Sequence, residues 1–222
     1  MPYKKNYKKK RRRRRRKKNY IPTTVSRQKP INDRALVKLK YVQDISINAG
    51  AAGLATSHYF RANSLFDPDF TGAGHQPLGF DQWMVFYQHY TVLGSKVSAS
   101  FVSDTGVPTI GGIALRSNTN AITDKDVLRE DGASVYSTLS TTTNADSAKV
   151  LSRNFSCKKF FGTKNILGED IYRGSDTTNP AEDAYFQIWV ASLDGVDPGP
   201  VNIQVTITYI AMLTEPVVPP RS

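Results

Sequence analysis

The sequence predicts an all-β protein: an antiparallel double-sheet jelly roll with one or two short helices and long loops, preceded by a disordered basic N-terminal arm. Three observations predict this class. Residues 4–18 contain thirteen Lys and Arg residues and no acid. Beyond residue 34, apolar and polar residues alternate with period two in several stretches, which is typical of half-buried strands. Helical patterns are confined to two short stretches.

The arm comes first in the chain and is too highly charged to pack into a core. Its like charges repel, and it has little apolar surface to offset the entropy lost on ordering, so we expect disorder until a polyanion neutralises it. Phosphates are the expected partner, with sequence-blind and steeply salt-dependent binding. The predicted nucleic-acid contacts are Lys4, Lys5, Lys8, Lys9, Lys10, Arg11, Arg12, Arg13, Arg14, Arg15, Arg16, Lys17 and Lys18, with Arg27, Lys29, Arg34, Lys38 and Lys40 as further candidates.

Charge divides the chain into two parts. Residues 1–40 hold eighteen basic residues and one acid, a net charge of +17, whereas residues 41–222 hold twelve basic and eighteen acidic residues, a net charge of −6. The arm is therefore expected to bind a polyanion while the body has another task. An anionic membrane fits poorly, because the arm has no aliphatic stripe or lipidation signal and no stretch of 18 apolar residues exists, so no membrane insertion is expected.

The first strands follow a polar linker that ends near Pro30. In Ala35–Ile47, alternate apolar residues share one face, and Ser95–Ser103 repeats the pattern. Thr109–Arg116 is a short strand whose two glycines, Gly111 and Gly112, indicate a bulge or a close backbone approach.

Three further strands are expected in the second half of the chain. Lys149–Phe161 is mixed but strand-like. Ala184–Leu193 is apolar on both faces, as in a central strand covered on both sides. The clearest alternation is the last, from Val201 to Thr214.

Two short helices are predicted between these strands. The first would span Asp81–Tyr90, with Asp81 as its N-cap. The second would span Thr123–Arg129, with Thr123 as its N-cap. Together with the long polar connections, this pattern favours a jelly roll over an immunoglobulin-like sandwich, which has evenly spaced strands and a Cys–Trp–Cys trio. The predicted organisation is an arm and linker in residues 1–32, the jelly roll in residues 33–216 and a tail in residues 217–222.

Residues with catalytic chemistry do not form a recognised motif, so we predict a protein that is not an enzyme, with no catalytic residue, no metal and no cofactor. His58, His75 and His89 lack zinc-site spacing. Asp67 and Asp69, with His75 and Asp81, are the densest set of oxygen and nitrogen ligands, but Asp-Pro also forms turns. The lone cysteine, Cys157, is predicted to be a buried apolar residue.

The stretch from Tyr59 to Gly94 contains FRAN, DPD, HQP and GFDQ, followed by four residues, YQHY. This stretch, together with the basic arm and one β-rich domain, resembles the capsid proteins of circular Rep-encoding single-stranded DNA viruses, the circovirus-like group. The resemblance implies a jelly-roll shell domain that assembles into an icosahedral T=1 shell of sixty copies. It implies an arm that packages circular single-stranded DNA inside the virion, and host import receptors that bring the protein to the nucleus for assembly.

The segment Tyr59–Tyr90 is too long for a tight hairpin, and we expect it to form contacts between subunits. Trp83 and Phe86 are the predicted anchors at the subunit interface. The alternative is that these aromatic side chains fill the core of their own subunit.

Three other functions stay open at this point. A coat protein of a small RNA virus or satellite would have the same fold and arm and a different cargo. A cellular chromatin- or ribosome-associated protein would also have a basic arm, but such proteins usually have basic bodies as well. A nuclease tethered to nucleic acid would need converging carboxylates, for which Asp67, Asp69 and Asp81 are the candidates.

Overall fold

The computed structural model describes residues 31–103, 106–139 and 148–218. The chain divides into two units, Met1–Pro30 and Ile31–Ser222, and the description that follows concerns the second. Because residues 1–30 lie outside the described part, so do the predicted contacts Lys4 to Lys18, Arg27 and Lys29.

One sheet contains the two longest strands of the domain. Its order is β1 (Arg34–Asn48), β9 (Pro200–Pro216), β3 (Tyr87–Val102) and β6 (Lys149–Ser156), with the two-residue strand β7 (Arg173–Gly174) also paired with β3. All pairings are antiparallel, and β1 pairs with β9 along its whole length, from Arg34 opposite Thr214 to Asn48 opposite Pro200.

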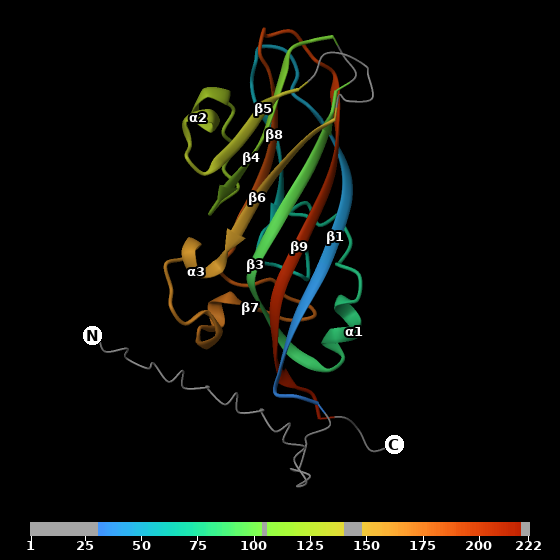
Figure 1. Ribbon diagram of the computed structural model, residues 1–222, viewed down its shortest axis with the longest axis vertical. Helices are drawn as coiled ribbons and strands as arrows, with labels where there is room; N and C mark the ends of the chain where they lie inside the picture. Colours follow the sequence, from blue (N-terminus) through green and yellow to red (C-terminus); the bar gives the residue numbers. More distant parts are fainter. Residues whose placement is uncertain (1–30, 104–105, 140–147, 219–222) are drawn as a thin grey trace, which may run out of the picture. The chain divides into compact units, whose positions relative to one another are not determined.

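The other sheet is shorter. Its order is β2 (Thr56–Arg61), β8 (Tyr185–Ser192), β4 (Thr109–Arg116) and β5 (Ser134–Thr138), again antiparallel throughout. In Figure 1 the β1-β9-β3-β6 sheet lies in front and the β2-β8-β4-β5 sheet behind it.

The connectivity of the two sheets is that of a jelly roll. The chain passes from one sheet to the other between β1 and β2, β2 and β3, β3 and β4, β5 and β6, β7 and β8, and β8 and β9. Strands distant in sequence thereby become neighbours, as in the double Greek key of this fold. The predicted fold class is therefore confirmed.

The core lies between the sheets and follows from the alternation. In β1 the predicted apolar face, which includes Val37, Leu39 and Tyr41, is buried, while the intervening side chains are exposed. In β3 the same holds for Val97, Ala99 and Phe101.

Strand β8 is buried on both faces, as predicted. Its outer face holds Trp189, which packs in a small second cluster with Ile110 and Leu128, the latter on α2 (Lys125–Glu130). The glycines of β4 make this packing possible. A Cβ atom on Gly112 would lie 2.5 Å from the indole of Trp189, and one on Gly111 would lie 2.9 Å from the ring of Phe101. The groups that approach these two glycines closely are side-chain rings, and β4 pairs with β5 and β8 without the predicted bulge.

The predicted helix over Asp81–Tyr90 is wrong in extent and in its cap. Helix α1 spans only Phe80–Met84, and its N-cap is Gly79, whose φ of 88° is accessible to glycine. Phe80 and Met84 face the core, and β3 begins at Tyr87 because Tyr87 and Tyr90 pair with the end of β9. Strand pairing thus overrides the local helical spacing.

The other helical predictions need smaller corrections. The N-cap of helix α2 is Asp124, one residue after the expected Thr123, and the Asp124 carboxylate accepts the Asp126 amide at 2.8 Å. The predicted strand Lys149–Phe161 ends at Ser156, where α3 (Cys157–Phe160) begins, followed by the 3-10 turns η2 (Ile166–Gly168) and η3 (Asp170–Tyr172). No described helix is long and apolar enough to cross a membrane.

Candidate nucleic-acid interface

The basic residues predicted at the start of the folded domain lie on the first strand. Arg34, Lys38 and Lys40 all belong to β1 and are exposed, because they alternate with the core residues of that strand. β1 is an edge strand of its sheet, so these side chains lie at the border of the outer sheet face.

A fourth basic residue joins them from β3. Lys40 lies opposite Thr208 on β9, and Thr208 lies opposite Lys96 on β3, so one cross-strand row holds both lysines. Two strand spacings separate their backbones, about 10 Å. We call the outer surface of this sheet the basic face, defined by Arg34, Lys38, Lys40 and Lys96. Lys96 was not among the predicted contacts. The alternation in Ser95–Ser103 puts Lys96 on the outer face of that strand, so the sequence pattern could have identified it as a further candidate.

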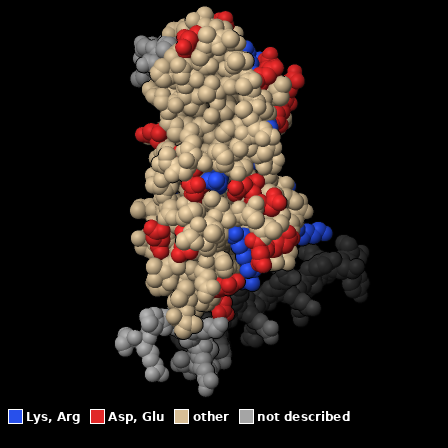
Figure 2. Space-filling view, turned by 180° about the vertical axis from the view of Figure 1, so that it is seen from behind, with Lys and Arg blue, Asp and Glu red and all other residues tan. Residues whose placement is uncertain are grey.

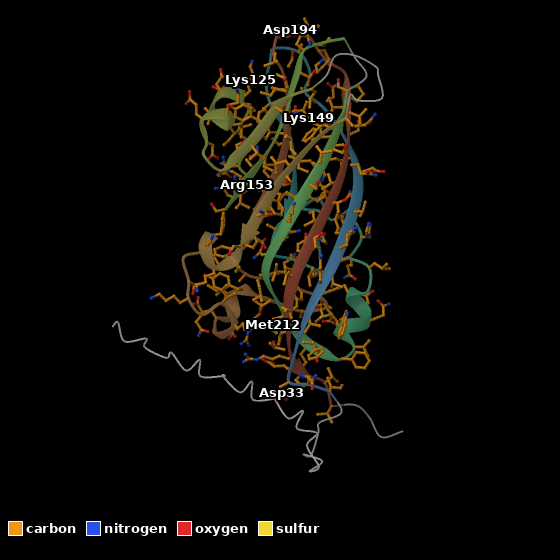
Figure 3. All side chains as sticks on the ribbon, in the orientation of Figure 1. Asp33, Lys125, Lys149, Arg153, Asp194 and Met212 are labelled. Atoms are coloured by element: carbon orange, nitrogen blue, oxygen red, sulfur yellow. The ribbon has the colours of Figure 1, made fainter. Side chains whose placement is uncertain are left out.

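The rest of the basic face mixes polar side chains with exposed apolar ones, including Leu36, Val42 and Ile210, and has few acids. Its exposed and half-exposed side chains on β9 and β3 include hydroxyls and amides, such as Gln204, Thr206 and Ser98, and its described acid on β1 is Asp44. In Figure 3 Met212 lies toward the lower end of β9. Lys149 and Arg153 lie along β6, but they are opposite the core residues Phe101 and Val97 and so do not belong to the basic face.

The opposite side of the domain has a different charge. Figure 2 shows it from behind, with Asp and Glu more prominent than Lys and Arg. Helix α2 contributes to the acidic character of the domain surface, since Asp124, Asp126 and Glu130 are all exposed. A polyanion would therefore be attracted to one sheet face and repelled from the other.

A groove runs beside the edge of β1, between that strand and the segment before α1. It has a volume of about 390 Å³ and is lined by Lys38, Lys40, Val42, His75, Gln76 and Leu78. His75 holds the segment against the strand: its Nε2 lies 2.9 Å from the Val42 carbonyl oxygen and its Nδ1 2.7 Å from that of Gln76. Its ring also packs on Tyr41, with centroids 4.6 Å apart.

Asp69 fixes the same segment from inside. The carboxylate is buried, accepts Gln43 Nε2 at 2.7 Å and Thr71 Oγ1 at 2.8 Å, and lies 3.0 Å from His58 Nε2. Burial alone would raise the pKa of Asp69, but the hydrogen bonds from Thr71 and Gln43 outweigh burial and hold the pKa below its usual value.

Arg61 organises the neighbouring turn. Its guanidinium donates to Asp67 Oδ2 at 2.6 Å and lies 3.4 Å from Asp183 Oδ2, while its carbonyl accepts the Tyr209 hydroxyl at 2.8 Å. Burial strongly raises the pKa of Tyr209, which keeps that hydroxyl protonated as a donor. The FRAN and DPD motifs thus act inside the subunit.

The four candidate metal ligands do not converge. Asp67 pairs with Arg61, Asp69 with Gln43 and Thr71, and His75 with backbone carbonyls, while Asp81 is exposed on α1. Among the described residues no group of three His, Cys, Asp or Glu side chains is placed to hold a metal ion.

Apolar side chains gather on the surface around α1. Trp83 is 38% exposed and Phe86 47% exposed, so neither fills the core of its own subunit. Leu78, which is 91% exposed, and Val85 lie within the same nine residues. We call these four residues the α1 surface. The structure leaves these side chains accessible, and whether a second subunit covers them stays a prediction.

Comparison with known proteins gives likeness in fold alone. No protein-family model matches the sequence, and no curated protein matches it. Among solved structures, the chain is similar to the nodavirus of the giant freshwater prawn Macrobrachium rosenbergii, solved as a semi-empty virus-like particle. The two sequences are 10% identical and the TM-score is 0.48. The match covers 93% of this chain and 96% of that chain.

Other similar structures are also viral. Turnip yellow mosaic virus gives 11% identity and a TM-score of 0.46, with 84% and 96% of the two chains covered. The 60-mer BFDV capsid protein gives 10% identity and a TM-score of 0.42, with 86% and 100% covered. The structural neighbours of the chain are thus virus particles and capsid proteins of several groups, among which the comparison does not single out the circovirus-like one.

Proposed function

We propose that this protein is a viral coat protein that assembles into a small icosahedral shell and packages nucleic acid through its basic N-terminal arm. The observation that carries the proposal is the division of one chain between a +17 segment and a jelly roll whose remaining residues carry −6. A nucleic-acid-binding protein with a basic body would spread its phosphate contacts over the fold.

The basic face supports the same proposal. Residues 1–30 precede β1, and β1 itself continues the positive charge with Arg34, Lys38 and Lys40 on its exposed side. A cargo bound by residues 4–18 would therefore meet further cations where the folded domain begins. In a closed shell that holds its cargo inside, the basic face would therefore point toward the interior.

The finer proposal follows from the resemblance of the Tyr59–Gly94 stretch to circovirus-like capsid proteins. We propose a T=1 shell of sixty subunits, circular single-stranded DNA as cargo, and nuclear import through the arm. RNA is the alternative cargo, because phosphate binding by Lys and Arg does not distinguish the two nucleic acids.

The experiment that tests the proposal compares the full-length protein with a variant lacking residues 2–18. Both are purified and examined by negative-stain electron microscopy and by absorbance at 260 and 280 nm. The full-length protein is expected to form uniform spherical particles that contain nucleic acid, and the shortened protein to remain folded without retaining it.

Nuclease digestion of the disrupted particles then identifies the cargo. Sensitivity to deoxyribonuclease supports the DNA proposal, and sensitivity to ribonuclease alone supports the RNA alternative. A full-length protein that stays small at physiological salt, even with added single-stranded DNA, would contradict the coat-protein proposal.

A further inference from the structure

The groove beside β1 is lined by more cations than three other hollows on the described part of the domain surface. Two of its lining residues, Lys38 and Lys40, are cations, and no Asp or Glu lines it. The hollow beside β6 also lacks acids, but it holds a single lysine, Lys159. The larger hollow at the far end of the same sheet includes Asp44, and the one beside β7 includes Asp170 and Glu215.

The two lysines are available for an anion. Neither has an ion-pair partner among the residues that the structure describes, and both are exposed. Their positions, two apart on one strand, place the backbones about 7 Å from each other with the side chains on the same side. Both ammonium groups are therefore close enough to contact one short stretch of phosphodiester backbone.

The remaining lining fits a base better than a bare phosphate. Val42 and Leu78 present exposed apolar surface, and the His75 imidazole and the polar Gln76 also line the groove. Unpaired bases are commonly bound by packing on aromatic rings, histidine included, with backbone contacts from Lys and Arg. A groove of about 390 Å³ is large enough for one nucleotide.

The position of the groove along the chain favours the same occupant. Lys38 lies twenty residues after Lys18, and β1 begins four residues before Lys38. A strand bound by the arm is thus held at high local concentration near the groove. The arm itself is a poor occupant, because its charge has the same sign as that of Lys38 and Lys40.

We infer that this groove, lined by Lys38, Lys40, Val42, His75, Gln76 and Leu78, binds a nucleotide of single-stranded nucleic acid as a second contact site beyond the arm. This inference rests on the proposed function, since the strand that fills the groove is the cargo of the arm. It assigns a base-packing role to Leu78 and His75 and a phosphate-binding role to the two lysines.

The test uses the full-length chain, a fluorescein-labelled oligo(dT), and fluorescence anisotropy at several salt concentrations, with protein dilute enough to stay unassembled. The variant K38Q/K40Q is compared with K158Q/K159Q, which removes the same charge from exposed lysines on α3. The plot of log K against log salt has a negative slope. Removing two phosphate contacts to a single strand should make this slope shallower by about 1.4, and only in K38Q/K40Q. In parallel, a thiothymidine-substituted oligo(dT) is photo-crosslinked, and the expected adduct lies on the peptide that contains His75 and Leu78.

The outcomes separate the inference from the function on which it rests. Wild-type protein that does not bind oligo(dT) overturns both. Wild-type binding with equal slopes in both variants, or crosslinks confined to residues 1–30, overturns the inference alone. An unchanged slope in K38Q/K40Q together with impaired particle formation also overturns it and indicates a second copy of the chain as the occupant.

Discussion

At the scale of single residues, the contact between Gly112 and Trp189 shows how tightly the second sheet is packed. The two residues lie directly opposite each other on β4 and β8, and the indole occupies the space that a Cβ atom on residue 112 would need. Trp189 is fully buried and is covered by α2. The glycine is therefore required by its neighbour and not by its own backbone angles.

We expect Gly112→Ala to destabilise the domain by about 1–3 kcal/mol, the usual cost of overpacking a dense core. Guanidinium unfolding followed by circular dichroism would measure the change. Gly132→Ala is the matched control, because a Cβ atom there meets nothing within 4 Å. Equal stability of the two variants would show that the indole moves aside at little cost.

Cys157 provides a prediction on pH. Burial, with a smaller contribution from Glu169, raises the pKa of this thiol from 9.0 to about 11. Below pH 9 the thiol is protonated in both states and contributes nothing. As pH rises from 9 toward 11, the unfolded chain loses this proton first, so folding stability falls by on the order of 2 kcal/mol.

The measurement is the free energy of unfolding at pH 8 and pH 10.5 for the wild type and Cys157→Ala. The tyrosines titrate in both proteins, so the difference isolates the thiol. We expect a smaller alkaline loss in Cys157→Ala, whereas parallel losses would place the alkaline sensitivity elsewhere.

Which site residues could be predicted from the sequence depends on how local their role is. Alternation in β1 assigns Arg34, Lys38 and Lys40 to the face opposite the core without knowledge of the partner strand, and they are exposed there, while their contact with nucleic acid stays a prediction. The roles of Asp69 and His75 could not be predicted in this way. Asp69 is fixed by Gln43 on β1 and His58 on β2, and His75 by the Val42 carbonyl, so their roles depend on pairing between distant segments.

At the scale of elements, the connection between β2 and α1 is the feature on which the groove depends. Asp69 joins this connection to both sheets through Gln43 and His58. Since its folded-state pKa is lowered, its contribution to stability is present above about pH 4 and is lost as pH falls through the folded value.

We expect Asp69→Asn to cost about 1–3 kcal/mol, because an amide cannot accept all the hydrogen bonds that the carboxylate accepts. Limited proteolysis should cleave the connection near residues 70–76 faster in this variant. The control is Asp81→Asn, which changes an exposed carboxylate on α1. Unchanged proteolysis in Asp69→Asn would mean that His75 alone holds the connection.

The elements themselves were predicted unevenly, for physical reasons. β1, β4, β8 and β9 follow from alternation or continuous apolar runs, which report burial directly. β2 and β5 are short, and most of their side chains are only partly buried, so they show no clean alternation. The spacing of Trp83, Phe86, Tyr87 and Tyr90 fits a helix, but pairing of the last two with β9 determines the outcome.

At the scale of the whole molecule, the part of the α1 surface outside the groove, Trp83, Val85 and Phe86, is the accessible apolar patch that best fits a contact between subunits. Burying Trp83 and Phe86 against a second copy would add aromatic area, which is typical of interface anchors. In the proposed shell, the same contact would repeat around a symmetry axis.

The double variant Trp83→Ser/Phe86→Ser is therefore expected to stay folded and to assemble at least tenfold less readily, as judged by the protein concentration needed for particles in light scattering. Val127→Ser, an exposed apolar change on α2, serves as the control. Normal assembly of the double variant would leave the two aromatic residues without a role between subunits.

The pairing of β1 with β9 has a consequence for how the protein is made. β1 is the first strand of the domain and β9 the last, and β9 also pairs with β3. Contacts between segments so distant in sequence slow folding, because a long loop must close before they form. On the ribosome, β1 has no partner until β9 emerges, so the domain is completed only after synthesis. Nascent chains would then expose the edge of β1, and chaperone binding during translation is expected to fall sharply once β9 has emerged.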